Sequence, residues 1–304
     1  MKKIIVFLAG IILTNIIIQD IHAQQNVLNG IYVKERDLNR KPVPYPNLRE
    51  ADVMWSKEIQ RKVDLREKMN HPLYYPTRQI GERMSLIDLL LYGIKNEGLT
   101  PYDPNGNPGD EFKTVITWSE ILGKFDAGVD TVSTIDVSTG EPVTRIVENE
   151  MTTSEVKQYI VKEIWYFDRK YSTLQVRIVG LCPIREFFKQ TAQMQGGQAL
   201  AASGGASEEE NDDNATQTKL FWVYFNDARP LFANHEVFNT FNDAERRTFD
   251  DIFFKRKFAS YIVQESNVYD NRDINEYSLG TNAVLESERI KNWIFTTEHD
   301  LWEY

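Results

Sequence analysis

The stretch Val161–Ile184 constrains the fold more than any other, because it is the densest apolar segment beyond the N-terminal region and has the pattern of a β-hairpin. Ile164–Phe167 predicts one strand and Leu174–Leu181 predicts the other. Apolar and polar side chains alternate in the second strand, which is typical of a sheet with one buried side. Asp168–Ser172 supplies a polar turn between them. Two isolated strands are not stable in water, so further strands and helices must cover this hairpin.

The first 23 residues have the pattern of a secretory signal. Lys2 and Lys3 precede the apolar run Ile4–Ile18, and the small residue Ala23 stands before Gln24. A retained membrane anchor is the alternative, but the apolar run is short for a membrane span. We therefore predict a cleaved signal peptide over residues 1–23 and export of the remaining chain. No cysteine directly follows the run, so we expect any membrane attachment to come through a partner.

The charge and the single cysteine exclude some classes of function. The formal net charge is −10, and loss of the signal would make it one unit more negative. An acidic exported protein is unsuited to binding nucleic acid or an anionic membrane through bulk electrostatics, so we expect no nucleic-acid partner. The only cysteine, Cys182, lies at the end of an apolar strand and has no partner for an internal disulfide. We expect it to be buried as a small hydrophobic residue.

Two segments between the signal and the hairpin have different patterns. Gln24–Asn47 is rich in proline and lacks periodicity, which predicts an extended arm that wraps its own domain or reaches a neighbour. Arg49–Asn70 has neither glycine nor proline and predicts a helix, with Trp55, Ile59 and Val63 on one apolar stripe and a second stripe beside it. The two stripes indicate either contact with two different surfaces or a single core.

Further signals complete the order of elements. Capping boxes at Ser85 and Thr117 predict two helix starts, and a third at Thr152 predicts a helix that leads into the hairpin. The other predicted elements are a second hairpin over Thr131–Val137 and Val143–Val147, a strand over Leu220–Phe225, a long helix over Asn242–Ser266 with two apolar sides, and a final helix around Leu285–Ile294. Because regular βαβ alternation is missing, the predicted fold class is α+β: a mainly antiparallel sheet of hairpins packed with several helices, with an extended N-terminal arm.

The composition changes sharply at residues 191–218. This stretch is rich in Gly, Ala, Ser and Gln and contains the acidic run Glu208–Glu210, which predicts a flexible low-complexity insertion. A strand resumes directly afterwards, so the insertion is expected to join two strands of one sheet. The predicted organisation is therefore a signal peptide (1–23), an extended arm (24–47) and a single α+β domain (48–304) that carries the insertion.

No motif for catalysis, cofactor binding or metal binding is found in the sequence. The histidines His71, His235 and His299 have no second His or Cys at metal-ligand spacing. His235 and Glu236 are adjacent, so their side chains point apart and a surface role is expected. The adjacent acids Asp250 and Asp251 are expected to pair with basic residues one turn away, which are Arg246, Arg247, Lys255 and Arg256. We therefore predict that the protein is not an enzyme and uses no cofactor.

Several stretches resemble the GldN/PorN family, a periplasmic component of the type IX secretion and gliding machinery of Bacteroidota. The similarity lies in the number and order of structural signatures spread over nearly the whole mature chain. The matching stretches are Val53–Lys57 with Val63–Lys68, Pro72–Pro76, Glu163–Asp168, Val176–Gly180, Phe221–Tyr224, and Phe249–Phe253 with Phe258–Ser260.

The resemblance implies a structural subunit that associates with itself in a ring. It implies binding to the outer-membrane lipoprotein GldK/PorK, which would supply the membrane attachment that this chain lacks. It also implies contact with the periplasmic domain of the motor protein GldM/PorM. The expected location is the periplasm, next to the outer membrane.

Four aromatic residues are the candidate partner contacts. They are Tyr45 in the arm, Trp55 in the predicted helix, and Tyr74 and Tyr75 in a proline-flanked loop. The competing interpretation is that these residues cover their own core. Clusters such as Tyr74–Tyr75 also motivate a second hypothesis, a periplasmic peptide- or glycan-binding module. A hydrolase built on scattered carboxylates is the third and ranks last.

Overall fold

The computed structural model describes residues 39–106, 111–135, 142–149, 151–188, 215–240, 242 and 244–300. The chain divides into two compact units, Met1–Arg40 and Lys41–Tyr304, and the fold described below belongs to the second. The predicted signal peptide, residues 24–38 of the predicted arm and residues 191–214 of the predicted insertion lie outside the described residues. Residues 41–47 of the arm contain neither helix nor strand.

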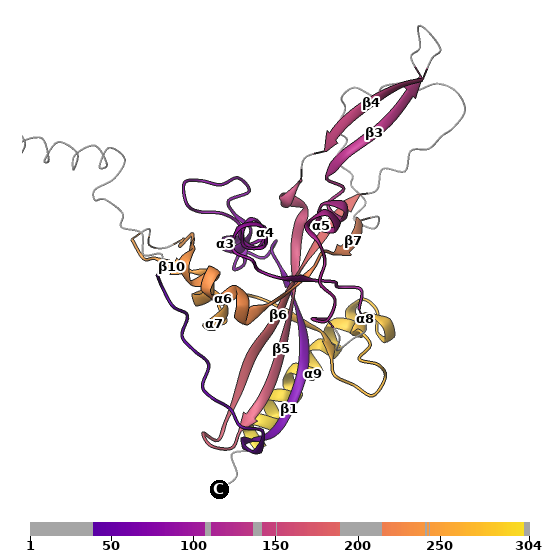
Figure 1. Ribbon diagram of the computed structural model, residues 1–304. Coiled ribbons are helices and arrows are strands. Elements are labelled where there is room, and N and C mark those ends of the chain that lie inside the picture. Colours follow the sequence, from indigo (N-terminus) through magenta and orange to yellow (C-terminus); the bar gives the residue numbers. More distant parts are fainter. Residues whose placement is uncertain are drawn as a thin grey trace, which may run out of the picture. The chain divides into compact units, whose positions relative to one another are not determined.

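A seven-stranded sheet organises the second unit (Figure 1). Its strand order is β11-β1-β5-β6-β8-β2, with β7 paired to β6, and every pairing is antiparallel. The strands are β1 (Val53–Asp64), β2 (Pro101–Tyr102), β5 (Val156–Asp168), β6 (Thr173–Phe188), β7 (Ala215–Lys219), β8 (Trp222–Tyr224) and β11 (Tyr261–Glu265).

The hairpin predicted over Val161–Ile184 is confirmed as β5 and β6. Both strands are longer than predicted, and they pair from Asp168–Thr173 at the turn to Val156–Arg185 at the far end. Gly180 lies where β6 meets β8, and a side chain there would collide with the ring of Phe112 and come within 3.2 Å of the carbonyl oxygen of Val223. β7 and β8 follow the predicted insertion and both pair with β6, so the insertion does join strands of one sheet.

The segment Arg49–Asn70 is mainly a strand, so the helix prediction was wrong. Its regular part is β1, which pairs with β5 from Val53 to Asp64, and a short 3-10 helix η2 (Glu50–Asp52) precedes it. Trp55, Ile59 and Val63 are four residues apart, and a spacing of four satisfies both the helical period of 3.6 and the strand period of two. The long polar side chains between them conceal the alternation.

The predicted long helix Asn242–Ser266 is also wrong. The segment contains a two-turn helix α7 (Phe249–Phe254), a turn, and the edge strand β11. Arg256 adopts a left-handed conformation with φ of 50°, which a helix cannot continue, and the amide of Lys257 donates to the carbonyl oxygen of Ile252. The apolar residues of the pattern are therefore divided among α7, the turn and β11.

The other helices pack on the sheet or at its ends. Ser85 and Thr117 begin helices as predicted, with Ser85 accepting from the amide of Asp88 and Thr117 forming a capping box with Glu120. The predicted helix at Thr152 is only the 3-10 turn η3 (Thr153–Glu155), because β5 starts directly after it. The helices are α3 (His71–Tyr74), α4 (Leu86–Asn96), α5 (Trp118–Lys124), α6 (Phe225–Asn234), α8 (Ile274–Tyr277) and α9 (Thr281–Asp300).

Two further strand pairs stand apart from the main sheet. β3 (Gly128–Ile135) and β4 (Pro142–Asn149) form the predicted second hairpin. β9 (Glu236–Val237) pairs with β10 (Arg247–Thr248), just before α7. With an antiparallel sheet and helices segregated from it, the predicted α+β fold class is confirmed.

The buried apolar residues form one large cluster and two small ones. The large cluster joins α4, α5, α6 and α7 to Tyr159 and Val161 of β5. One small cluster contains Ile160, Cys182 and Trp222, so Ile160 serves the opposite face of the sheet from its neighbours in β5. The other small cluster contains Ile290 and Ile294 of α9, which pack over β1 and β11. This cluster forms the base of the candidate site.

Candidate partner-binding site

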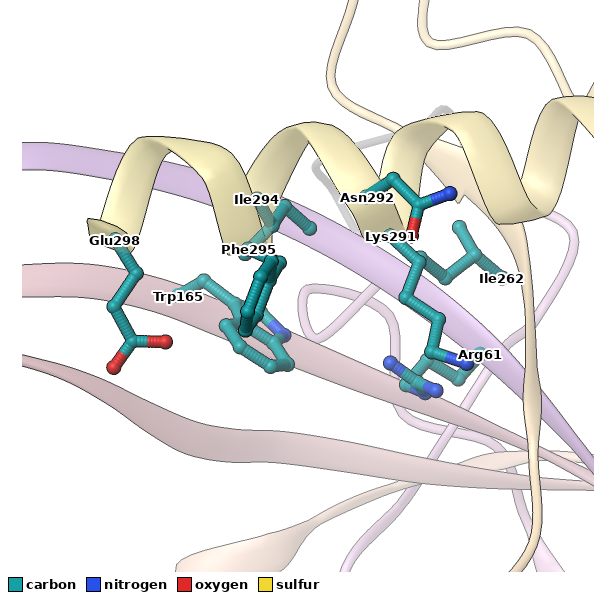
Figure 2. Close-up of a pocket in the computed structure, with 8 residues that line it drawn as sticks. All are labelled: Arg61, Trp165, Ile262, Lys291, Asn292, Ile294, Phe295 and Glu298. Carbon is teal, nitrogen blue, oxygen red and sulfur yellow. The ribbon is translucent and has the colours of Figure 1, made fainter. Parts of the chain in front are cut away.

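A groove runs between α9 and the strands β1, β5 and β11 (Figure 2). Its volume is about 420 Å³, which lies within the range of small-ligand and peptide-side-chain pockets. The groove is lined by Arg61, Trp165, Ile262, Lys291, Asn292, Ile294, Phe295 and Glu298. Figure 2 shows Phe295 beside Trp165, with Arg61 and Lys291 at one end of the groove and Glu298 at the other.

The amphipathic sequence of α9 explains why the groove is open. Ser287, Ile290 and Ile294 recur at helical spacing and are buried against the sheet. Phe295 follows Ile294 but is 68% exposed, because its position faces away from the buried stripe. A phenylalanine that leaves most of its surface in water contributes little to the core and is available to a partner.

Arg61 gives the groove a positive charge, which the nearby carboxylates Glu163 and Glu288 offset only in part. Its Nε donates to Ser260 Oγ at 2.9 Å and its Nη2 to the Ser260 carbonyl oxygen at 3.3 Å. Burial lowers the pKa of Arg61, and the charge of Glu163 offsets this only in part. Glu163 is held by Arg256 at 2.9 Å. Among the residues that the structure describes, no carboxylate forms an ion pair with Arg61, so this cation favours an anionic ligand.

Trp55, a predicted contact residue, lies next to this groove. Its ring is 5.8 Å from that of Trp293 in α9, and the Lys57 ammonium lies 4.7 Å from the Trp293 ring. Lys57 also pairs with Glu265 of β11 at 2.7 Å. The indole of Trp55 thus helps to attach α9 to β1 and remains half-buried.

Tyr45, the predicted contact in the arm, docks on the same unit. The guanidinium groups of Arg229 and Arg177 lie 4.6 and 5.4 Å from the centre of its ring, and the ring of Phe254 lies 6.2 Å away. Arg177 also donates to the carbonyl oxygen of Pro46. Burial raises the pKa of the Tyr45 hydroxyl. These contacts fix residues 45–46 beside β6 and α6.

Tyr74 and Tyr75 differ from each other. The Tyr74 hydroxyl donates to the Ser154 carbonyl oxygen at 2.9 Å, and its ring packs against the main core. Tyr75 is 51% exposed and meets the Tyr74 ring edge-on at 4.9 Å. The structure therefore does not bring the four predicted residues into one site: Trp55 borders the groove, Tyr45 lies beside β6, and the tyrosine pair lies at α3.

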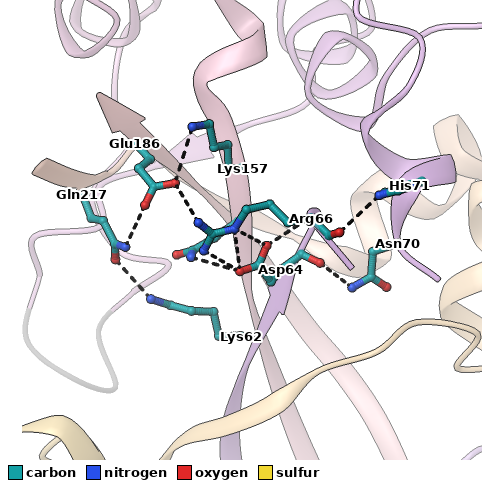
Figure 3. A network of polar contacts seen from close by, with 9 residues as sticks. Lys62, Asp64, Arg66, Asn70, His71, Lys157, Glu186 and Gln217 are labelled. Carbon is teal, nitrogen blue, oxygen red and sulfur yellow. Dashed lines mark hydrogen bonds and ion pairs between the residues drawn. The ribbon is translucent and has the colours of Figure 1, made fainter. Parts of the chain in front are cut away.

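A polar network at the end of β1 holds the fold together (Figure 3). Asp64 accepts from Arg66 at 2.8 Å, and although burial opposes its ionisation, the hydrogen bonds from Arg66 prevail and lower the pKa of Asp64. Asn70 Nδ2 donates to the carbonyl oxygens of Asp64 and Ala259, and its Oδ1 accepts from the Ala259 amide. The network thus ties β1 to the segment before β11.

Other polar groups that the sequence singled out are held in structural contacts. His235 is buried rather than at the surface, with Nδ1 2.9 Å from the Leu231 carbonyl oxygen, so the expected surface role was wrong. Asp251 pairs with Lys255 as predicted, but Asp250 pairs with Arg229 of α6. Cys182 is buried as predicted, and burial raises the pKa of its thiol to about 12.

The described residues contain neither a cluster suited to a metal ion nor a helix suited to a membrane. In the described ranges, no group of three or more His, Cys, Asp or Glu side chains is placed to hold a metal ion. No helix in the same ranges is both long and apolar enough to cross a membrane.

The groove residues were missed by sequence reasoning because they come from four separate elements. Arg61 and Ile262 lay inside segments that were predicted to be helices. The signal that could have found β1 is the placement of Val53, Trp55, Ile59, Val63 and Leu65 at odd positions, from which only Met54 departs.

Comparison with known proteins identifies the family. No curated protein matches the chain. The family model described as gliding motility associated protein GldN matches residues 48–303, which is most of the sequence. The match includes every strand of the main sheet and the α9 groove, and it confirms the family resemblance seen in the sequence. The protein therefore belongs to the GldN family and is a component of the gliding-motility and type IX secretion machinery.

Proposed function

We propose that this protein is a structural subunit of a periplasmic ring associated with the outer membrane in the type IX secretion and gliding machinery. In this role it binds a GldK/PorK-type lipoprotein, which attaches it to the outer membrane, and it contacts the periplasmic domain of a GldM/PorM-type motor protein. The observation that carries the proposal is the family match over residues 48–303. The predicted signal over residues 1–23 supports the periplasmic location.

The arrangement of side chains supports a scaffold role. Several buried polar side chains form ion pairs and hydrogen bonds that link elements, such as Arg229 with Asp250 and Asn70 with Ala259. Apolar side chains that remain exposed gather on the C-terminal elements, among them Val268, Leu279, Val284 and Phe295. Exposed apolar side chains that gather in one region mark surfaces for protein partners.

The experiment that tests the proposal is affinity purification of the tagged protein from gently solubilised outer membranes. Co-purified material is then analysed by mass spectrometry and electron microscopy. Large rings that contain a lipoprotein are the expected result. A monomer that is reproducibly free of partners under the same conditions would contradict the proposal.

The α9 groove favours one second candidate, a periplasmic peptide-binding module, because Trp165, Phe295 and Arg61 could hold an apolar and acidic peptide. Thermal-shift screening of the monomer separates the two functions. A small peptide that raises the melting temperature clearly would favour the binding module, because a ligand that binds only the folded state stabilises it.

A further inference from the structure

A loop before α8 exposes apolar side chains although it is held in a defined shape. The loop is Ser266–Arg272, between β11 and α8. Val268 is 90% exposed and Tyr269 is 63% exposed, and Asp270 beside them is also exposed. Asp270 and Asn271 both adopt left-handed conformations, with φ of 57° and 54°. Two successive residues in this region are uncommon outside glycine, although Asp and Asn tolerate it best.

Hydrogen bonds to Asn267 and Asn271 hold the loop in this shape. Asn267 Oδ1 accepts from the Tyr269 amide at 2.9 Å, and Asn271 Oδ1 accepts from the Asn267 amide at 2.9 Å. Asn267 Nδ2 donates to the Glu265 carbonyl oxygen at 3.2 Å, and the side chain of Gln264 donates to the Asn271 carbonyl oxygen. The Arg272 guanidinium lies over the Tyr269 ring at 4.7 Å. A loop that is already ordered loses little entropy when it binds.

The α9 groove has the complementary chemistry. Its apolar walls are Trp165, Ile294 and Phe295, and its charged end holds Arg61, which has no ion-pair partner among the described residues, together with Lys291 (Figure 2). The loop tip offers the matching groups in three consecutive residues: an aliphatic, an aromatic and an acidic side chain. Within the described ranges, Asp270 likewise forms no ion pair.

The loop and the groove lie toward opposite ends of α9. Arg272 stacks on Tyr277, whose hydroxyl donates to Glu286 Oε1 at 3.4 Å, which places the loop beside the N-terminal half of the helix. The groove is lined by Lys291–Glu298 in the C-terminal half. From Glu286 to Ile294 the helix rises about 12 Å. Two different surfaces at two ends of an element suit a head-to-tail contact, which closes into a ring when the rotation permits.

We propose that the tip Val268–Asp270 of one copy of this chain inserts into the α9 groove of the next copy. Val268 and Tyr269 pack against Trp165 and Phe295, and the Asp270 carboxylate approaches Arg61. The inference rests on the proposed function, because it supplies the contact by which the subunit repeats around a ring.

Cysteine cross-linking tests this contact. Val268→Cys and Phe295→Cys are combined in one chain, and the assembled complex is treated with a mild oxidant. Repeated head-to-tail contacts predict a ladder of dimers, trimers and larger covalent species. Each single variant lacks one of the two thiols and should give no ladder, and a mixture of the two single variants should give a one-to-one cross-linked dimer. The native Cys182 is buried and should stay unmodified.

A matched control pairs Phe295→Cys with Val115→Cys, which is also exposed but lies in another part of the unit. Rings that form normally while the Val268 and Phe295 pair gives no ladder would overturn this contact and leave the proposed function standing. Absence of any ring from the unmodified protein would overturn both.

A second measurement does not depend on thiol geometry. Val268→Ala removes the most exposed apolar side chain of the loop and should weaken self-association at least tenfold, while the melting temperature stays unchanged. Unchanged self-association in this variant would contradict the proposal.

Discussion

The aromatic side chains around α6 and α7 form a closed core, whereas the aromatic side chains of α9 remain partly exposed. In the first region, Phe225, Phe232 and Phe253 are almost wholly buried, with ring centres 5.6 to 5.9 Å apart. In the second, only a few isoleucines are buried, while Phe295 and Trp293 on the same helix keep much of their surface in water. Both regions contain aromatic residues, so the presence of aromatic residues alone does not separate them.

This difference shows that the burial of an aromatic residue, and not its type, decides whether it stabilises the fold or is available to a partner. A closed aromatic core contributes its apolar area to the free energy of folding. A helix that is fixed by one narrow stripe keeps its other apolar side chains for a partner. We therefore expect substitutions near α6 and α7 to change stability, and substitutions on the exposed side of α9 to change assembly.

The largest expected effect comes from Phe253→Ala in the closed core. Removing a buried phenylalanine loses its transfer free energy and leaves a cavity, so the free energy of unfolding should fall by about 3–5 kcal/mol. Denaturant unfolding measures it. The matched control is Phe254→Ala in the same helix, which is 45% exposed and should cost less. Equal losses in the two variants would contradict the closed-core account.

The next largest effect on stability is expected from breaking the buried ion pair that links α6 to α7. Arg229 Nε and Asp250 Oδ1 are 2.9 Å apart, and both side chains are nearly inaccessible. Asp250→Ala leaves the guanidinium without its partner and should cost about 3 kcal/mol. Lys255→Ala breaks the exposed pair with Asp251 and should cost less than about 1 kcal/mol. If the two variants unfold at the same denaturant concentration, the buried pair does not have the assigned role.

A smaller effect is expected from pH. Burial raises the pKa of Cys182 from 9.0 to about 12, so the folded state keeps the proton that the unfolded chain releases. This stabilisation is complete below pH 9 and is lost as the pH rises from 9 to 12, with a slope of at most about 1.4 kcal/mol per pH unit. Unfolding free energies of the wild type and Cys182→Ala, measured from pH 8 to 11, should show a shallower decline in the variant. If the unfolding free energies of the two proteins fell in parallel with pH, the raised pKa of Cys182 would be contradicted.

The smallest effect on stability is expected from Phe295→Ala. Its ring is mostly exposed, so the free energy of unfolding should change by less than about 0.5 kcal/mol. Recovery of the assembled ring should nevertheless fall, because the groove loses one wall. Sedimentation of the assembled complex and thermal unfolding of the free protein together measure the two properties. A Phe295→Ala variant that is destabilised but assembles normally would show that Phe295 serves the fold and not the interface.

The sequence predicted the secondary structure correctly wherever a local pattern fitted only one type of element. The β5–β6 hairpin combines a period of two with a polar turn, and the helix at Ser85 combines a capping box with an apolar run, so both were predicted. α6 was not predicted, because Pro230 lies inside it. The error at β1 came from a spacing of four residues, which fits both the helical and the strand period. The error before β11 came from the left-handed conformation of Arg256, because no glycine marks the turn there.

The candidate site could not be predicted to the same degree. The groove depends on Arg61, Trp165, Ile262 and Phe295, which are brought together only by strand pairing and by the packing of α9 on the sheet, across more than two hundred residues of sequence. Single aromatic residues such as Trp55 and Tyr45 could be chosen as candidates, but their burial is a property of the packed structure. Only the family similarity, which uses the whole chain, indicated a partner-binding protein.

Hydrogen exchange, compared between the free and the ring-assembled protein, tests the central claim most directly. The claim is that the C-terminal elements form the interface while the region around α6 and α7 serves the fold. We predict slower amide exchange on assembly in Val268–Asn271 and Lys291–Glu298, with no change in Phe249–Phe254. Unchanged exchange in α9 and in the loop, with new protection around α7, would contradict the account.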